Sequence, residues 1–219
     1  MTRSKIRPSK NIENYLLSEM GVSRETLEKL QAYVDLLAEW QNKTNLVSNN
    51  TLNDVWQRHI CDSLQCSDIL PNKMRWLDLG TGAGFPGLVL AIVNRDNSNF
   101  DMQLVESSGK KCAFLRRVIR ETGAIANVTN SRIESVVKRF SDCEVVSARA
   151  LAPLDRLFDL THHWLEQGTI GLFPKGRDYL HELEKCRGVW EFDLVLHPSR
   201  IEKDSVLLEI SNVRKSIAK

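Results

Sequence analysis

The segment of this chain with the clearest chemical potential is an acidic residue followed by alternating glycines: residues 78–84 read Asp-Leu-Gly-Thr-Gly-Ala-Gly. Apolar residues at 76, 77 and 79 predict a short buried strand, which the glycines end because they tolerate unusual backbone angles. Pro86 then favours a first helical turn, and the apolar run 88–93 suits a helix buried against a sheet. A strand, a glycine loop and a helix in this order place a ligand at the carboxyl end of a strand in an open α/β sheet.

Charge narrows the choice of ligand for this loop. Residues 82–87 match the dinucleotide pattern G-x-G-x-x-G, so a nicotinamide cofactor is one alternative. Asp78 is expected at the mouth of the strand, where its carboxylate would repel a pyrophosphate and attract a cation, and Pro86 removes an amide donor that a phosphate would use. Both features favour S-adenosylmethionine, which carries an ammonium and a sulfonium and no phosphate. The spacing from Asp78 to Gly84 is also the usual first motif of methyltransferases with a Rossmann-like fold; a tight turn without a ligand is the remaining alternative.

A second acid stands where a nucleoside site would need one. Residues 102–105 predict a strand, and Glu106 closes it about twenty residues after the glycines, where Rossmann-like folds place an acid that accepts ribose hydroxyls. Glu106 therefore supports a nucleoside site without choosing between nicotinamide and adenosylmethionine; a solvated acid at a strand end is the alternative. After the next strand, Ile133 could cover one face of an adenine. Arg132 and Glu134 fit a local ion pair equally well.

The remaining pattern predicts the elements that must position these residues. Ser23 can cap a helix that reaches residue 40, and the first 70 residues predict a helical extension. Further on, Gly123 is expected to end a helix over 108–122 as a left-handed cap. Strands are expected near 76–79, 102–105, 127–130, 144–150, 168–174, 189–196 and 205–210, with a hairpin at 197–199. We expect one domain over 1–219 with a helical extension over 1–70 and a Rossmann-like core of class I methyltransferase type over 71–219. Its seven-stranded α/β sheet should be mainly parallel, with helices on both faces.

Composition excludes several classes of protein. The formal net charge is +2, so any contact with a polyanion must come from a local patch. The five cysteines form no C-x-x-C pair and His162-His163 has no third ligand at a suitable spacing, so we expect free thiols and no metal. No run of eighteen apolar residues suggests a membrane span, and we expect a cytoplasmic protein. Basic surface residues are more often simply solvated than functional. Those that could contact RNA phosphates are Arg116, Arg117, Arg120, Lys138, Arg139 and the amino-terminal Arg3, Lys5, Arg7 and Lys10.

Motifs that the chain lacks limit the methyl acceptor. The segment after the fourth strand reads Ala150-Leu151-Ala152-Pro153 and not the (Asn/Asp/Ser)-Pro-Pro-(Tyr/Phe) that exocyclic amine methylation uses. No Pro-Cys pair offers a nucleophile for cytosine C5. A ring nitrogen such as guanine N7 needs neither, because its lone pair is free and no proton must leave, so catalysis reduces to alignment. The lack of these motifs permits N7 but does not select it.

The chain resembles the bacterial small-subunit rRNA guanine-N7 methyltransferase family called RsmG or GidB. The match runs in register from about residue 23 to 176, and its most specific parts are the Phe-Pro-Gly ending of the glycine loop and the upstream Arg-His-x-x-Asp-Ser-Leu. The matching segments are Asn45-Leu46-Val47-Ser48, residues 58–64, residues 78–87, Glu106-Ser107, Lys110-Lys111, Phe114-Leu115, Ser131-Arg132-Ile133-Glu134, Ser147-Ala148-Arg149-Ala150 and Lys175-Gly176.

The resemblance implies an S-adenosylmethionine-dependent enzyme that methylates a guanine of 16S rRNA in the small ribosomal subunit; we expect it to act as a monomer. It implies contacts with adenosylmethionine at Gly80, Phe85, Ile133, Glu134 and Arg149, to which we add Asp78 and Glu106 from the charge and ribose arguments and Gly82 and Gly84 from the loop. No catalytic residue is assigned, but Arg149, His59 and Lys175 are candidates. His59 either contacts substrate or caps and packs Asp62.

Two functions of other classes compete with this hypothesis. One is a non-catalytic ribosome- or rRNA-binding protein that keeps a methyltransferase fold, against which the intact acid-glycine loop and Glu106 speak. The other is a nicotinamide oxidoreductase.

Overall fold

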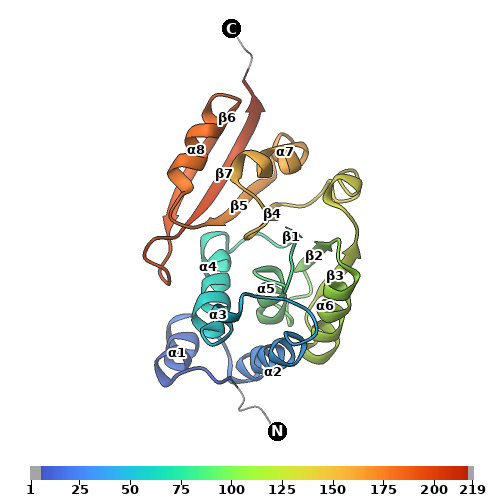
Figure 1. Ribbon diagram of the computed structural model, residues 1–219, viewed down its shortest axis with the longest axis vertical. Helices are drawn as coiled ribbons and strands as arrows, with labels where there is room; N and C mark the ends of the chain where they lie inside the picture. Colours follow the sequence, from blue (N-terminus) through green and yellow to red (C-terminus); the bar gives the residue numbers. More distant parts are fainter. Residues whose placement is uncertain (1–5, 217–219) are drawn as a thin grey trace.

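The apolar runs of the sequence form the strands of one seven-stranded sheet in the order β3-β2-β1-β4-β5-β7-β6. The computed structural model describes residues 6–216, so the candidate RNA contacts Arg3 and Lys5 lie outside the described residues. Strands β1 to β5 are parallel, and β7 runs antiparallel to both β5 and β6. This confirms the predicted seven-stranded, mainly parallel α/β sheet (Figure 1). The strands are β1 Arg75–Leu79, β2 Asp101–Glu106, β3 Ala126–Asn130, β4 Val145–Ser147, β5 Ile170–Lys175, β6 Trp190–Pro198 and β7 Val206–Lys215.

Helices precede the sheet and then alternate with its strands, as predicted. Ser23 caps α2 by accepting a hydrogen bond from the Thr26 N–H, and Gly123 ends α6 with a φ of 71°. Before β1 come α1 Lys10–Asn14, η1 Tyr15–Glu19, α2 Arg24–Trp40, α3 Asn49–Leu52, η2 Trp56–Cys61 and α4 Asp62–Ile69. After it come α5 Gly87–Val93, α6 Gly109–Thr122, η3 Ile133–Ser135, α7 Leu154–Leu165 and α8 Tyr179–Arg187. Among the described residues, no helix is long and apolar enough to cross a membrane.

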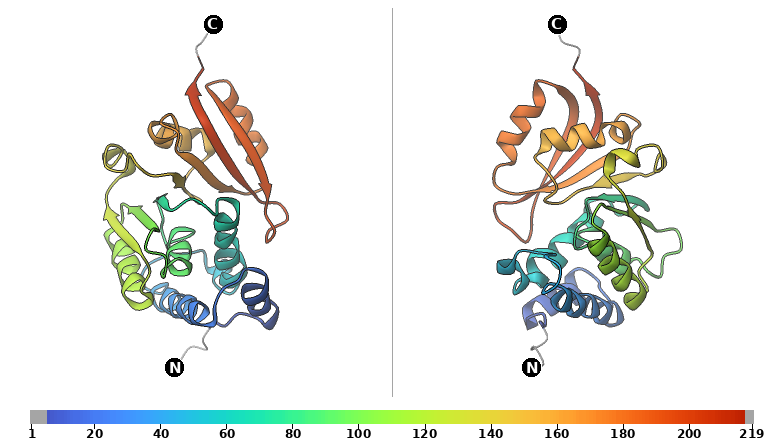
Figure 2. Two further views of the ribbon diagram at one scale, coloured as in Figure 1. Left: turned by 180° about the vertical axis from the view of Figure 1, so that it is seen from behind. Right: turned by 45° about the vertical axis from the view of Figure 1, so that its right-hand side comes forward.

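Two apolar cores lie on the two faces of the sheet. One joins α2, α4, α5 and α6, and includes the fully buried Tyr33 and Phe114. The other lies under α7 and α8, around Phe158 and Trp164. Figures 1 and 2 show the amino-terminal helices gathered against α5 and α6, with α7 and α8 beside the β6–β7 end of the sheet. The helical extension therefore shares a core with the sheet, although the proposed domain limits at residues 70 and 71 remain a prediction.

The structure corrects two boundaries in the second half of the sheet. The fourth strand ends at Ser147 rather than at residue 150, because the chain turns at Ala150, whose φ of 52° is left-handed. Arg149 therefore lies on the loop after β4. The final hairpin does not turn at 197–199: β6 continues to Pro198, and residues 199–205 form the connection. A proline is tolerated there because β6 is an edge strand.

The glycine loop has the backbone that its sequence predicts. Gly80, Gly82 and Gly84 have φ values of 60°, 56° and 102°, which side chains rarely allow. Gly87, at the start of α5, is constrained by space instead: a Cβ there would lie 2.4 Å from Leu104 Cδ2 and 2.8 Å from Asp78 Oδ2. The close approach of α5 to β1 and β2 requires a glycine at this position.

Gly87→Ala should therefore destabilise the fold, by about 1–3 kcal/mol, because the added methyl overpacks the contact between α5 and the sheet. Urea unfolding measures this change in the free energy of unfolding. Gly188→Ala is the matched control, because Gly188 has a φ of −81° and a Cβ added there would have nothing within 4 Å. Equal stability of the two variants would contradict this account of the packing.

Candidate functional site

Two adjoining cavities open along the carboxyl ends of the parallel strands. The Phe85 cavity, of about 350 Å³, lies between the glycine loop and the helical extension, and the Ile133 cavity, of about 330 Å³, lies beyond β2 and β3. Gly80, Lys111 and Ala150 line both, so the two form one cleft. The first is also lined by Leu46, Val47, Ser48, Thr51, His59, Thr81, Gly82, Ala83, Phe85 and Arg149. The second is also lined by Val105, Glu106, Ser107, Ser131, Arg132, Ile133, Glu134, Leu151, Arg156 and Leu160.

Asp78 lies behind the glycine loop and lines neither cavity. Its side chain is fully buried, and its carboxylate accepts hydrogen bonds from the Thr81 hydroxyl (2.5 Å), the Ser147 hydroxyl (2.8 Å) and the Gly87 N–H (3.3 Å). Burial raises the pKa of Asp78 to about 6, and the hydrogen bonds from Thr81 and Ser147 oppose this rise. The prediction that Asp78 faces a ligand at the mouth of the strand is therefore wrong, because its side chain is buried behind the loop. Its carboxylate positions the loop.

Glu106 joins the second strand to the same loop. Its carboxylate accepts hydrogen bonds from the Gly82 N–H (3.0 Å) and the Ser108 N–H (2.8 Å), and it lies on the wall of the Ile133 cavity. A carboxylate has four lone-pair sites, so two remain for a ligand. The interpretation of Glu106 as a solvated acid is wrong, because only 7% of the residue is exposed.

Tyr33 of α2 holds the other side of the loop, a role that sequence reasoning missed. Its hydroxyl donates a 2.6 Å hydrogen bond to the Ala83 carbonyl, and its ring lies 5.4 Å from that of Phe85. On the sequence, Tyr33 is one apolar position of an amphipathic helix. Its partner lies fifty residues further along the chain, a contact that only the tertiary packing reveals.

His59 lies in the Phe85 cavity and is held as a neutral imidazole. Its ring stacks on Phe85, with centroids 4.7 Å apart and planes inclined by 17°. Burial lowers its pKa to about 3, and the charges of Arg149 and Arg58 add to this effect. Within residues 6–216, neither ring nitrogen has a hydrogen-bond partner. His59 therefore does not cap Asp62, and that alternative is wrong.

Arg149 pairs with the helical extension across the cleft. Its Nη2 donates to the Arg58 carbonyl (2.6 Å) and lies 3.2 Å from Asp62 Oδ2. Its Nη1 is buried and finds no partner in the described part of the chain. Burial raises the pKa of Asp62, and Arg149 opposes that rise. The guanidinium is thus held at the cavity wall with one edge still able to donate.

The short helix η3, which follows β3, contributes an apolar residue and an exposed acid. Ile133 is buried on the wall of its cavity, beside Glu134, whose carboxylate lies 3.6 Å from Arg156. Glu134 therefore pairs with Arg156 of α7 and not with Arg132, the partner that the sequence suggested.

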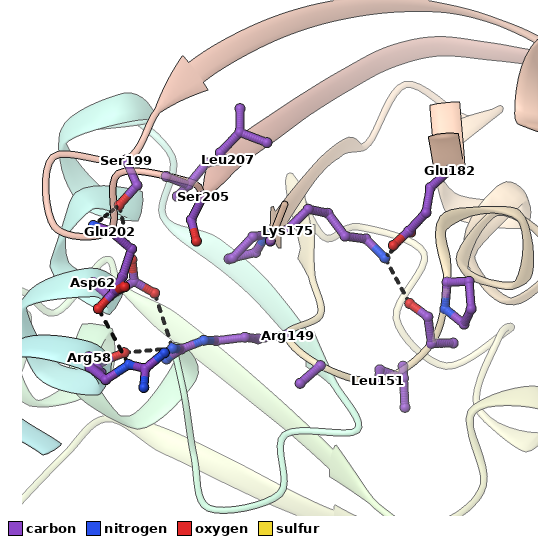
Figure 3. Close-up of a pocket in the computed structure, with 16 residues that line it drawn as sticks. Arg58, Asp62, Arg149, Leu151, Lys175, Glu182, Ser199, Glu202, Ser205 and Leu207 are labelled. Carbon is purple, nitrogen blue, oxygen red and sulfur yellow. Dashed lines mark hydrogen bonds and ion pairs between the residues drawn. The ribbon is translucent and has the colours of Figure 1, made fainter. Parts of the chain in front are cut away.

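A third cavity, of about 410 Å³, continues the cleft over β4, β5 and β7 (Figure 3). We call it the Lys175 cavity. It shares Arg149 and Ala150 with the Phe85 cavity, and Ala150 and Leu151 with the Ile133 cavity. The rest of its wall comprises Arg58, Asp62, Ala152, Pro153, Pro174, Lys175, Gly176, Glu182, Ser199, Glu202, Ser205, Val206 and Leu207. The three candidates Arg149, His59 and Lys175 thus lie along one cleft.

Some of the basic residues predicted to contact RNA already have partners in the protein. Arg116 donates to the Val128 carbonyl, and Arg117 pairs with Glu121 at 3.0 Å. Such exposed pairs contribute little and break readily. The role of this basic face, including Arg120, Lys138 and Arg139, stays a prediction. Among residues 6–216, no three His, Cys, Asp or Glu side chains gather as a metal site would require.

The chain matches known proteins over most of its length. Residues 26–204 match the family model GidB, described as rRNA small subunit methyltransferase G. A protein of Allorhizobium ampelinum named ribosomal RNA small subunit methyltransferase G is 47% identical over 91% of this chain and 96% of its own length. One of the same name from Methylobacterium nodulans is 50% identical over 90% of this chain and 94% of its own.

Solved structures share the fold at low sequence identity. A mutant of MtNAS in complex with S-adenosylmethionine matches with a TM-score of 0.56 and 17% identity, over 91% of this chain and 76% of its own. A fibrillarin/Nop5p complex matches with a TM-score of 0.52 and 16% identity, over 69% of this chain and 82% of its own.

The half-buried, neutral His59 should make the fold sensitive to acid. Its pKa in the folded chain lies below the ordinary value of 6.5, so between these values the unfolded chain binds a proton that the folded chain does not. Stability should therefore fall as the pH drops below 6.5. Relative to His59→Phe, the wild type should lose about 2 kcal/mol more between pH 7.5 and pH 5, as measured by urea unfolding at both pH values.

His181→Phe is the control, because His181 is exposed on α8. Parallel pH profiles for the wild type and His59→Phe would show that His59 is not held neutral by its surroundings.

Proposed function

Because the chain belongs to the rRNA small subunit methyltransferase G family, we propose that it transfers a methyl group from S-adenosylmethionine to N7 of a guanine in 16S rRNA of the small ribosomal subunit. The observation that carries this proposal is the family match together with one continuous cleft over the carboxyl ends of β1, β2 and β4. In an open α/β sheet, ligands bind at this edge.

The residues of the cleft fit adenosylmethionine. Glu106 has acceptor sites left for the two ribose hydroxyls, and Ile133 offers an apolar surface to an adenine beside Glu134. Gly80, Gly82 and Phe85 line the cavity on the other side of the loop, where the methionine part would lie. The carboxylates of Asp78, Glu106 and Asp62 make the surroundings favourable for a cation. Asp78 and Gly84 contribute through the shape of the loop.

Methyl transfer to N7 requires that the reacting groups are held in line and that water is excluded from the site. S-adenosylmethionine supplies a methyl carbon on a sulfonium, and attack by the guanine N7 lone pair breaks the carbon–sulfur bond with its electrons staying on sulfur. No proton leaves N7, so no general base is needed. The neutral His59 would add no positive charge close to the sulfonium. No cysteine among the described residues lines the three cavities, which fits an acceptor that needs no covalent intermediate.

The other functions have less support. A non-catalytic ribosome-binding protein would not need the loop, Glu106 and the cleft kept together. A nicotinamide enzyme would need phosphate donors at the start of α5, where the first turn begins with Pro86 and the Gly87 N–H donates to Asp78. We expect a cytoplasmic monomer that acts on the small subunit.

Glu106→Gln should weaken the binding of S-adenosylmethionine about tenfold or more, because a neutral amide replaces a charged acceptor that also holds Gly82. Isothermal titration calorimetry gives the dissociation constant. Glu121→Gln, on the exposed face of α6, should bind as the wild type does. Unchanged affinity in a folded Glu106→Gln protein would remove Glu106 from the site.

Deletion of the gene should remove one N7-methylguanosine from small-subunit rRNA, as measured by mass spectrometry of its nucleosides. Wild-type protein supplied from a plasmid should restore it, and Glu106→Gln should restore less. Full retention of N7-methylguanosine in the deletion strain, with no other enzyme compensating, would contradict the substrate.

A further inference from the structure

The Lys175 cavity contains a buried charged pair that the binding of adenosylmethionine leaves unused. Lys175 ends β5 and Glu182 lies on α8, and their charged groups meet at 2.7 Å. Only 9% of the Lys175 side chain is exposed, although both residues line the cavity. Figure 3 shows this pair on one side of the cavity, and Arg58, Asp62 and Glu202 on the other.

The pair is held in a fixed orientation by the backbone around it. Lys175 Nζ donates to the Ala152 carbonyl at 2.8 Å as well as to Glu182 Oε2. The same Oε2 accepts the Leu154 N–H at 2.7 Å. Both side chains are thus tied to the segment that joins β4 to α7. Burying a charged group as deeply as the Lys175 ammonium costs free energy unless the charge is paired. The ion pair with Glu182 should therefore keep its geometry.

Two hydrogen-bonding positions of the pair remain open. An ammonium has three donors, and within residues 6–216 only two of those on Lys175 have partners. Likewise, Glu182 Oε1 has no partner among the described residues, while Oε2 has two. The pair therefore presents one N–H donor next to one carboxylate acceptor.

This pattern complements guanine. On its Watson–Crick edge, guanine carries the acceptor O6 next to the donor N1–H, whereas adenine carries the donor N6–H₂ next to the acceptor N1. We propose that the Lys175 cavity receives the acceptor guanine, with Lys175 donating to O6 and Glu182 accepting from N1–H. Recognition through this edge leaves N7 free. The inference rests on the proposed function and adds how the base is selected.

The position of the cavity supports this assignment. It joins the adenosylmethionine cleft through Arg149, Ala150 and Leu151, so a base in it would lie beside the donor. An enzyme that modifies a base must take it out of its stack into such a pocket. On the opposite wall, Arg58 pairs with Glu202, and Arg149 keeps a free donor at Nη1 but no acceptor to place beside it. A purely structural role would account for the bonds to Leu154 and Ala152 but would give no preference among bases.

The first test uses the wild-type protein, so no variant has to fold. Small subunits are reconstituted with the mapped target guanine replaced by inosine, which keeps O6 and N1–H, or by adenine. Methyl transfer from labelled S-adenosylmethionine should stay within about tenfold for inosine and fall about a hundredfold or more for adenine. Equal rates for guanine and adenine, or loss of activity with inosine as severe as with adenine, would overturn the proposal.

The second test replaces the free hydrogen-bond acceptor of the pair with a donor. Glu182→Gln can still accept the Leu154 N–H through its amide oxygen, while its amide nitrogen presents a donor to the cavity. Its kcat/KM for guanine should fall about tenfold or more, and its preference for guanine over adenine should shrink by a similar factor. Its affinity for S-adenosylmethionine, measured by calorimetry, should change less than about twofold, because Glu182 lines only the Lys175 cavity.

Glu184→Gln and Lys185→Met, both at exposed positions of α8, are the matched controls and should behave as the wild type does. An unchanged preference for guanine in active Glu182→Gln would overturn the assignment while leaving the proposed function intact. Absence of transfer by the wild type to any small subunit, even with adenosylmethionine bound, would instead count against the proposed function.

Discussion

The structure depends on one buried carboxylate. Asp78 is removed from water at the end of β1, and a carboxylate in that position must be hydrogen-bonded. Its three partners, Thr81, Gly87 and Ser147, come from the glycine loop, the start of α5 and β4. These bonds fix how far the loop rises above the sheet and how closely α5 packs beneath it. The cleft has its shape because this single group joins three elements.

The other parts of the cleft are built around the same loop. Glu106 holds it from β2, and Tyr33 holds it from the helical extension. Farther along the edge, Arg149 and Asp62 join the loop after β4 to α4. The extension therefore supplies part of the cleft wall and is more than a cover for the sheet. This arrangement suits an enzyme whose chemistry needs an aligned, dry site rather than a reactive side chain.

Much of the fold could be predicted from local sequence patterns. The features that could not be predicted depend on contacts between residues far apart in the chain. Local sequence patterns predicted all seven strands of the sheet, and the positive φ values of the loop followed from its glycines. The sequence correctly placed Asp78 at the end of the strand. The position of a residue in the sequence does not show, however, whether its side chain faces the ligand or the protein interior. Tyr33 carried no signal, because its partner is distant in sequence. The hairpin boundary was missed because Pro198 marks a turn in isolation but is tolerated on an edge strand.

The most direct measurement of this account is the binding of S-adenosylmethionine by Asp78→Asn, which keeps the size of the side chain. An amide cannot accept from Thr81, Ser147 and Gly87 as the carboxylate does, so the loop should loosen although no residue that lines the cleft is substituted. The account predicts that calorimetry on the folded variant will show binding about tenfold weaker or worse, with faster hydrogen exchange in residues 80–87. Wild-type affinity together with a wild-type loop would contradict it.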